Sequence, residues 1–149
     1  MYALLKNFSK LPLRFIQNLA KSVGSLLYIT NSSIRRTTEI NLGIAYPELS
    51  ASERTRLAKR SVQSQCMTYA ESVKIWGSEP EFALKQIRNI HHPEIFTDAL
   101  KNPNGTLAVV PHFGTWELLN AWVNQHTSPV IMYKPSKNPD VDRFMLEAR

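Results

Sequence analysis

The chain has 149 residues, of which 43% are hydrophobic and 20% are charged, which fits one globular domain. Because Cys66 is the only cysteine, the sequence excludes an internal disulfide framework and a zinc site built of cysteines, and it favours a reducing, cytosolic environment. The net charge of +6 arises entirely from residues 1–38, which contain six Lys and Arg and no acid. A basic segment at one end of the chain favours anionic lipid as a partner and argues against nucleic acid.

Residues Leu11–Ile29 have the pattern of an amphipathic helix. Apolar side chains recur at steps of three and four, while Arg14 and Lys21 lie on the other side. Each of these cations would cost about 2.5–3.5 kcal/mol at the centre of a bilayer, so we expect the helix to lie in the membrane interface instead of spanning it. The alternative is a helix that packs on its own domain. We therefore assign residues 1–34 to a membrane-associating N-terminal helix and residues 35–149 to the main domain.

Two further helices are predicted before residue 77. Arg35–Tyr46 reads as a short helix that ends at a proline. Ser50 and Glu53 form a capping box, which begins a long helix that runs to about Trp76 and stops at Gly77.

A basic cluster marks the start of the long helix. Its members are Arg54, Arg56, Lys59 and Arg60. The cluster is either a solvated helix face or a contact for a phosphate group or a carrier protein.

The middle of the chain carries no metal-binding pattern. Residues 81–90 are predicted to be partly helix and partly strand, and Pro93 begins a helix that ends near Asn102. His91 and His92 are adjacent, so their side chains point apart, and no third ligand lies at metal spacing. We expect a surface or capping role for both histidines and no metal site.

Two short apolar runs predict buried strands. Thr106–Val110 ends at a proline, and Val130–Tyr133 follows a predicted helix at residues 116–126. A strand, a helix and a strand in this order predict a right-handed parallel βαβ unit. Asn138 and Pro139 then begin a last helix. The predicted fold class is therefore α/β, with a helical N-terminal region followed by a partial α/β/α sandwich that contains the βαβ unit.

A histidine and a carboxylate lie at the predicted turn from strand to helix, where open α/β sheets place their chemistry. His112 and Glu117 are five residues apart, which on a straight helix would put them roughly 140° apart around the axis. They can meet only if the chain bends before the helix, with Gly114 relaxing the backbone. Glu117 would then accept the Nδ1 proton of His112 and leave Nε2 free as a base.

The hexapeptide HFGTWE that contains this pair resembles the H-x4-D/E signature of the glycerolipid acyltransferase superfamily. More narrowly, it is similar to the HFGNWE-type box of the late lipid A biosynthesis acyltransferases, the lauroyl and myristoyl transferases. The resemblance covers residues 11–149 and includes Ala45-Tyr46-Pro47-Glu48-Leu49 and Tyr133-Lys134-Pro135. Thr115 replaces the usual Asn of the family, and Lys134 replaces the usual Arg.

The resemblance implies a function at the cytoplasmic face of the cell inner membrane. It implies transfer of a fatty acyl chain from acyl-carrier protein to a hydroxyl of a lipid A precursor, with His112 as general base and Glu117 as its orienting group. No cofactor is expected beyond the acyl-carrier donor, and inner-membrane lipid is the third expected partner.

Substrate-binding roles are expected for five residues. They are Gly114, Thr115 and Trp116 as backbone donors to the oxyanion, and Lys134 and Arg149 as clamps for phosphate.

Family members are about twice as long as this chain, so the expectation is a domain truncated at its C-terminus. Two alternatives stay open. One is a non-catalytic remnant that only associates with membrane, and the other is a glycerophospholipid acyltransferase, which shares the H-x4-E chemistry.

Overall fold

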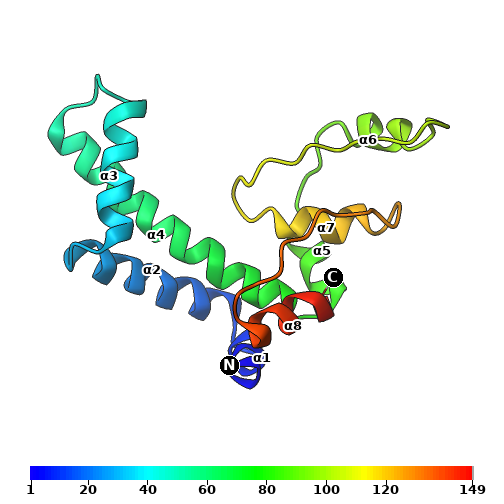
Figure 1. Cartoon of the computed structure of the whole chain (residues 1–149), viewed down its shortest axis with the longest axis horizontal. Coiled ribbons are helices and arrows are strands. Elements are labelled where there is room, and N and C mark those ends of the chain that lie inside the picture. Colours follow the sequence, from blue (N-terminus) through cyan, green and yellow to red (C-terminus); the bar gives the residue numbers. More distant parts are fainter. Residues whose placement is uncertain (149) are drawn as a thin grey trace. The chain divides into compact units, whose positions relative to one another are not determined.

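The computed structural model describes residues 1–148, and within them it contains eight α-helices and no β-strand (Figure 1). The chain divides into two compact units. One unit is Lys10–Lys74, and the other joins Met1–Ser9 to the part of the chain that begins at Ile75. Each unit is described by itself.

The unit Lys10–Lys74 is built from three helices. They are α2 (Leu13–Ile29), α3 (Ser33–Ala45) and most of α4 (Ala51–Trp76). The other unit contains five shorter helices: α1 (Tyr2–Ser9), α5 (Pro80–Gln86), α6 (Pro93–Ala99), α7 (Glu117–Val123) and α8 (Pro139–Ala148).

The helix starts follow local capping signals in the sequence. The N–H of Glu53 donates to Oγ of Ser50 at 3.3 Å, and the N–H of Ser50 donates to the Glu53 carboxylate at 3.0 Å, which is the reciprocal pair of a capping box. At α8, Oδ1 of Asn138 accepts the N–H of Asp140 at 3.0 Å. The predicted helices at 11–29, 35–46 and 50–76 are confirmed to within a few residues at their ends.

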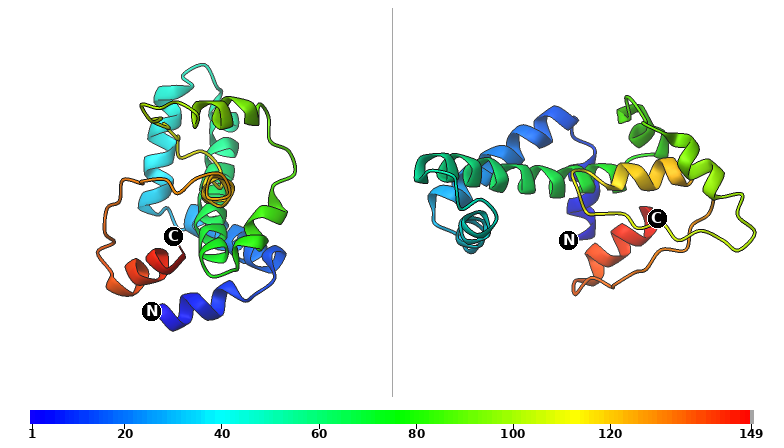
Figure 2. Two further views of the ribbon diagram at one scale, coloured as in Figure 1. Left: turned by 90° about the vertical axis from the view of Figure 1, so that its right-hand side faces the viewer. Right: turned by 90° about the horizontal axis from the view of Figure 1, so that it is seen from above.

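Helix α2 packs along α4 through a close contact at Gly24 (Figure 2). A Cβ at Gly24 would lie 2.7 Å from Cα of Gln63, so the α4 backbone leaves no room for a side chain there. Ile16 and Val62 are fully buried. Gln63 also donates to Ser25 at this contact, and Gln17 donates to Glu71 farther along, so the two hydrogen bonds fix the register of the two helices.

A polar network closes the turn from α2 to α3. The Tyr28 hydroxyl and the Arg35 guanidinium both donate to Oε1 of Glu39 at 2.9 Å, and the guanidinium lies 4.4 Å from the centre of the Tyr28 ring. Burial acts to raise the pKa of Glu39, but the hydrogen bonds from Arg35 and Tyr28 outweigh it and lower the pKa below its usual value. The carboxylate therefore stays charged and holds both partners.

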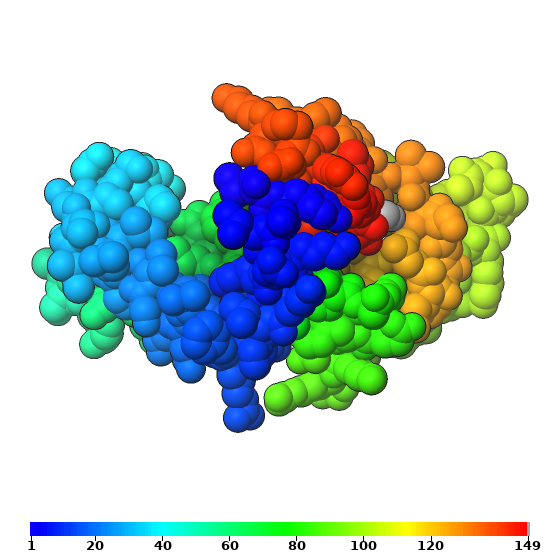
Figure 3. Space-filling view, turned by 90° about the horizontal axis from the view of Figure 1, so that it is seen from below, coloured from blue at the N-terminus to red at the C-terminus, as the bar shows by residue number. Residues whose placement is uncertain are grey.

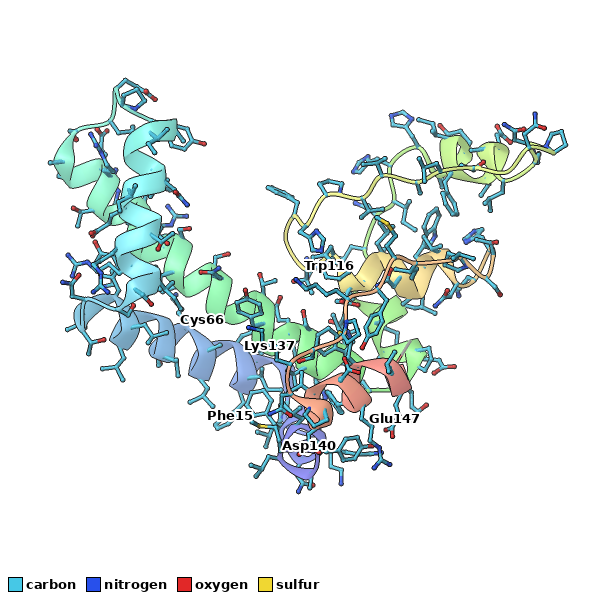
Figure 4. All side chains as sticks on the ribbon, in the orientation of Figure 1. Phe15, Cys66, Trp116, Lys137, Asp140 and Glu147 are labelled. Carbon is cyan, nitrogen blue, oxygen red and sulfur yellow. The ribbon has the colours of Figure 1, made fainter. Side chains whose placement is uncertain are left out.

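In the other unit, α1 and α8 lie side by side, as the space-filling view shows (Figure 3). The rings of Tyr2 and Phe144 meet edge to face with centroids 6.0 Å apart. The N-terminal amine of Met1 pairs with Asp140 at 3.0 Å, and the Tyr2 hydroxyl donates to Glu147 (Figure 4). These contacts hold the first residues of the chain against its last described helix.

Gly77 ends α4, as the sequence predicts, and a close contact adds a second reason for glycine. A Cβ there would lie 2.0 Å from Oγ of Ser9, whose hydroxyl donates to the Gly77 carbonyl oxygen at 3.3 Å. The end of α4 therefore packs directly on α1.

The predicted α/β fold class is wrong for the part of the chain that the structure describes. Residues 106–110 and 130–133 form no strand, so there is no βαβ unit and no α/β/α sandwich. A strand exists only where a neighbouring strand takes its backbone hydrogen bonds, and these runs meet no such neighbour. Their apolar side chains stay in solvent, with Leu107 90% exposed and Met132 99% exposed. Residues 81–90 also contain no strand, since α5 ends at Gln86 and irregular chain follows.

The contact at Gly24 predicts opposite effects for two glycine substitutions. Gly24→Ala should lower the free energy of unfolding by about 1–3 kcal/mol, because the new methyl group meets α4 backbone that cannot move aside. Gly43→Ala on α3 is the matched control, since its Cβ would meet only the end of the flexible Arg54 side chain at 3.3 Å. It should be neutral or stabilise by up to about 1 kcal/mol. Urea unfolding followed by circular dichroism measures both, and equal midpoints for the two variants would contradict the close contact.

Candidate active site

The segment before α7 bends at Gly114. Its φ is +59°, in the left-handed region that residues with a Cβ rarely adopt. No atom lies within 4 Å of a Cβ built there, so the backbone conformation, and not lack of space, requires the glycine. The bend brings the chain from the irregular residues 106–113 into the first turn of α7.

His112 lies two residues before Gly114 and is exposed. Its ring meets the Trp116 ring edge to face, with centroids 4.6 Å apart and planes at 69°. This contact joins His112 to Trp116, the residue directly before α7. An imidazole in this position is open to a substrate.

Glu117 is the first residue of α7, and it is only 2% exposed. A buried carboxylate needs hydrogen-bond donors, and Nδ2 of Asn120 donates to Oε2 of Glu117 at 2.9 Å. The first turn of a helix also favours negative charge. The predicted hydrogen bond between Glu117 and Nδ1 of His112 stays a prediction.

Thr115 and Trp116 connect the bend to the helix. Their carbonyl oxygens accept the N–H groups of Leu118 at 3.1 Å and Leu119 at 3.0 Å, so both residues are part of the helix start (Figure 4 labels Trp116). Gly114, Thr115 and Trp116 are thus next to both members of the predicted pair.

The structure describes one of the two residues that are predicted to bind phosphate. Lys134 is exposed in the irregular segment before α8. Its neighbour Tyr133 donates through its hydroxyl to Asp142 on α8, and the N–H of Ser136 donates to the same carboxylate. Arg149 lies outside the described residues.

Two residues that sequence reasoning missed help to position this region. Asn120 fixes the Glu117 carboxylate, and Asp142 ties the Tyr133-Lys134-Pro135 segment to α8. The first had a sequence signal, because residues three apart on a helix are neighbours on its surface. The second had none, since nothing local relates an aspartate on α8 to a loop nine residues earlier.

Aromatic contacts hold the far end of α7. Trp122 contacts Phe96 of α6 with ring centroids 5.1 Å apart and His126 with centroids 4.6 Å apart. Phe113, by contrast, is 87% exposed and belongs to no core.

The model of one protein family matches the whole chain, residues 1–149, and its description is bacterial lipid A biosynthesis acyltransferase. The chain belongs to this family. The match confirms the resemblance seen in the HFGTWE hexapeptide and extends it to the first residue. It also establishes the general reaction of the family, acyl transfer in lipid A biosynthesis. No curated protein matches the sequence closely enough to count as a relative.

The left-handed backbone conformation at Gly114 predicts how two substitutions change the stability of this lipid A acyltransferase family member. Gly114→Ala should lower the free energy of unfolding by about 1 kcal/mol, because alanine is strained at a φ of +59°. Gly114→Asn should cost less, since asparagine tolerates the left-handed region better than other residues with a Cβ. Chemical denaturation of the two variants beside the wild type checks this, and equal stability of all three would show that the bend is not fixed.

Proposed function

We propose that this chain transfers a fatty acyl group from acyl-carrier protein to a hydroxyl of a lipid A precursor, with His112 as the general base. The observation that supports this most directly is the exposed imidazole of His112, which lies beside the bend at Gly114 and five residues before the buried carboxylate of Glu117. The family model also matches the whole chain. Proton abstraction from an alcohol needs an accessible base, and a nearby carboxylate can orient it.

The proposed reaction is a direct transfer without an acyl-enzyme. Nε2 of His112 takes the hydroxyl proton as the oxygen attacks the thioester carbonyl carbon, the C–S bond breaks, and the proton passes from the imidazolium to the leaving thiolate. Glu117 keeps the proton on Nδ1 and stabilises the imidazolium. Cys66 is a poor candidate nucleophile, because burial raises the pKa of its thiol and disfavours the reactive thiolate.

The developing oxyanion needs donors at the same place. We assign this role to backbone N–H groups of Gly114, Thr115 and Trp116 at the start of α7. Lys134 and Arg149 are proposed to bind phosphate of the lipid A precursor. Lysine binds phosphate as a point charge and not through the bidentate fork of arginine.

We also propose that the protein works at the cytoplasmic face of the inner membrane, with α2 in contact with lipid. None of the helices in residues 1–148 is both long and apolar enough to cross a bilayer. One face of α2 nevertheless presents large apolar side chains to solvent: Phe15, Leu19, Val23, Leu26 and Ile29, each between 43% and 70% exposed. We call this face the α2 apolar stripe. Arg14 and Lys21 lie roughly 120–140° around α2 from the centre of this stripe, and their long side chains can extend along the helix toward anionic head groups.

A second candidate function is membrane binding without catalysis. The observation that favours it is the exposure of the apolar residues around His112, with Leu107 90%, Val109 87% and Phe113 87% exposed. An acyl chain bound among them would stay largely in water.

Two substitutions test the catalytic proposal. His112→Ala should lower the rate of acyl transfer by about 10²–10⁴-fold, because the general base is lost. Glu117→Gln should keep the fold, since a glutamine oxygen can still accept from Asn120, but it should lose at least about nine tenths of the rate because a neutral amide stabilises imidazolium poorly. His91→Ala, an exposed histidine outside the site, is the control. The assay follows labelled acyl chains from acyl-carrier protein to the lipid A precursor, and equal background in wild type and His112→Ala would support the second candidate.

The α2 apolar stripe predicts where lipid binds. Replacing Leu19 and Leu26 together by Glu should weaken binding to vesicles that contain phosphatidylglycerol by at least about tenfold, since the burial of two leucines is lost. The control replaces Ile40 and Ile44 on α3, which are 63% and 76% exposed, by Glu. Co-sedimentation with vesicles measures both, and release by the α3 pair alone would move the lipid contact away from α2.

A further inference from the structure

A shallow hollow lies over the first turns of α4. It is lined by Leu49, Glu53, Arg56, Leu57 and Arg60, and we call it the α4 hollow. Leu49 and Leu57 supply apolar surface, and the two arginines supply positive charge on the same side of the helix. Lys59 lies next to Arg60 in the sequence and is also exposed.

In the described part of the chain, the basic side chains at this hollow are not held in ion pairs, and the one recorded interaction is the charge of Arg56 acting on Glu53. Among the ion pairs of residues 1–148, none involves Arg56, Lys59 or Arg60. Arg54 differs from them, because it donates to the carbonyl oxygen of Leu49 at 2.8 Å and so holds the chain that leads into α4. The sequence cluster is therefore divided into one structural arginine and three exposed cations.

The one carboxylate in the hollow is already engaged. Hydrogen bonds from the side chain and backbone of Ser50 lower the pKa of Glu53, and the charge of Arg56 acts in the same direction. Glu53 thus serves the helix start, and its hydrogen bonds to Ser50 hold it there. This leaves the arginines able to take a carboxylate from outside.

The hollow and the α2 apolar stripe point to opposite sides of the α2–α4 pair. Around α4, the mean direction of the hollow residues on this helix lies roughly 170° from that of Ala58 and Val62, which are buried with Tyr28 in the core. Around α2, the stripe lies roughly 140° from the buried face that contains Ile16 and Gly24. If the stripe rests on lipid, the hollow faces the aqueous phase.

We propose that the α4 hollow is the docking surface for an acidic helix of a soluble protein, namely the carrier that presents the acyl thioester. The argument is charge complementarity. The unit Lys10–Lys74 contains ten Lys and Arg against four Asp and Glu, whereas the rest of the chain contains eight of each sign. A helix with carboxylates on either side of one apolar side chain would place that side chain on Leu49 and Leu57 and its carboxylates on Arg56 and Arg60. This proposal rests on the proposed function, which supplies the need for a protein-borne donor.

Anionic lipid is the competing occupant, and sidedness argues against it. A phosphate head group would also satisfy Arg56 and Arg60, but the surface that suits a bilayer is on the other side of the helix pair. The apolar floor made by two leucines further suits a protein side chain better than a head group.

The test measures binding separately from catalysis. The double variant Arg56→Glu/Arg60→Glu should weaken binding of purified acidic acyl-carrier protein by about tenfold or more, because attraction becomes repulsion at the rim. Its residual binding should also depend less on salt. The control Lys85→Glu/Arg88→Glu makes the same charge change at two exposed cations of the other unit. Isothermal titration calorimetry gives the affinity, vesicle co-sedimentation gives lipid binding, and circular dichroism checks the fold.

Each outcome decides the proposal. Loss of carrier binding with vesicle binding unchanged, and no loss in the control, supports it. Loss of vesicle binding with carrier binding unchanged would assign the α4 hollow to lipid, and no change in either would remove the site. If the double variant is misfolded, Arg56→Gln/Arg60→Gln replaces it, with a smaller expected loss of about threefold to fivefold. Failure of the proposed function has a different signature, since His112→Ala should bind the carrier normally whether or not the wild type transfers an acyl chain.

Discussion

The candidate site depends on the burial of the Glu117 carboxylate at the first turn of α7. A charge in that place must be met by donors, and Asn120 on the next turn supplies one, so the carboxylate and the helix start are fixed together. The left-handed bend at Gly114 then sets where the preceding residues lie, and the His112 ring contacts the Trp116 ring. These three constraints lie close together within residues 112–120, and the packing of α5 against α7 adds to the burial of Glu117.

This locality explains which features could be predicted from the sequence. The capping box of Ser50 and Glu53 and the cap at Asn138 each depend on a few adjacent residues. The helices α4 and α8 begin directly after these caps. The predicted strands at 106–110 and 130–133 are wrong, because the formation of a strand depends on a partner strand and not only on its own residues. An apolar run with β-branched residues indicates only that a strand could form if a partner lies alongside, and the described chain places none there.

Burial was also harder to predict than helicity. The spacing of apolar residues on α2 reads as one wide face, but the structure divides it. Ile16 and Ala20 are buried, while Phe15 and Leu19 remain exposed. A helix wheel gives the direction of each side chain, but only the position of the neighbouring helix decides which direction is covered. The basic cluster on α4 shows the same limit, since Arg54 differs from its neighbours only through a contact with Leu49.

The exposed chain on either side of α7 has a practical consequence for handling the protein. Residues 106–113 and 130–133 are irregular, lack backbone pairing to a strand and expose large apolar side chains such as Val130 and Met132 to water. Proteases cut most readily in exposed, irregular chain of this kind. Limited digestion should therefore nick the polypeptide beside the HFGTWE hexapeptide before it opens the α2–α4 pair. The exposed apolar side chains of these segments should also make the purified protein prone to self-association.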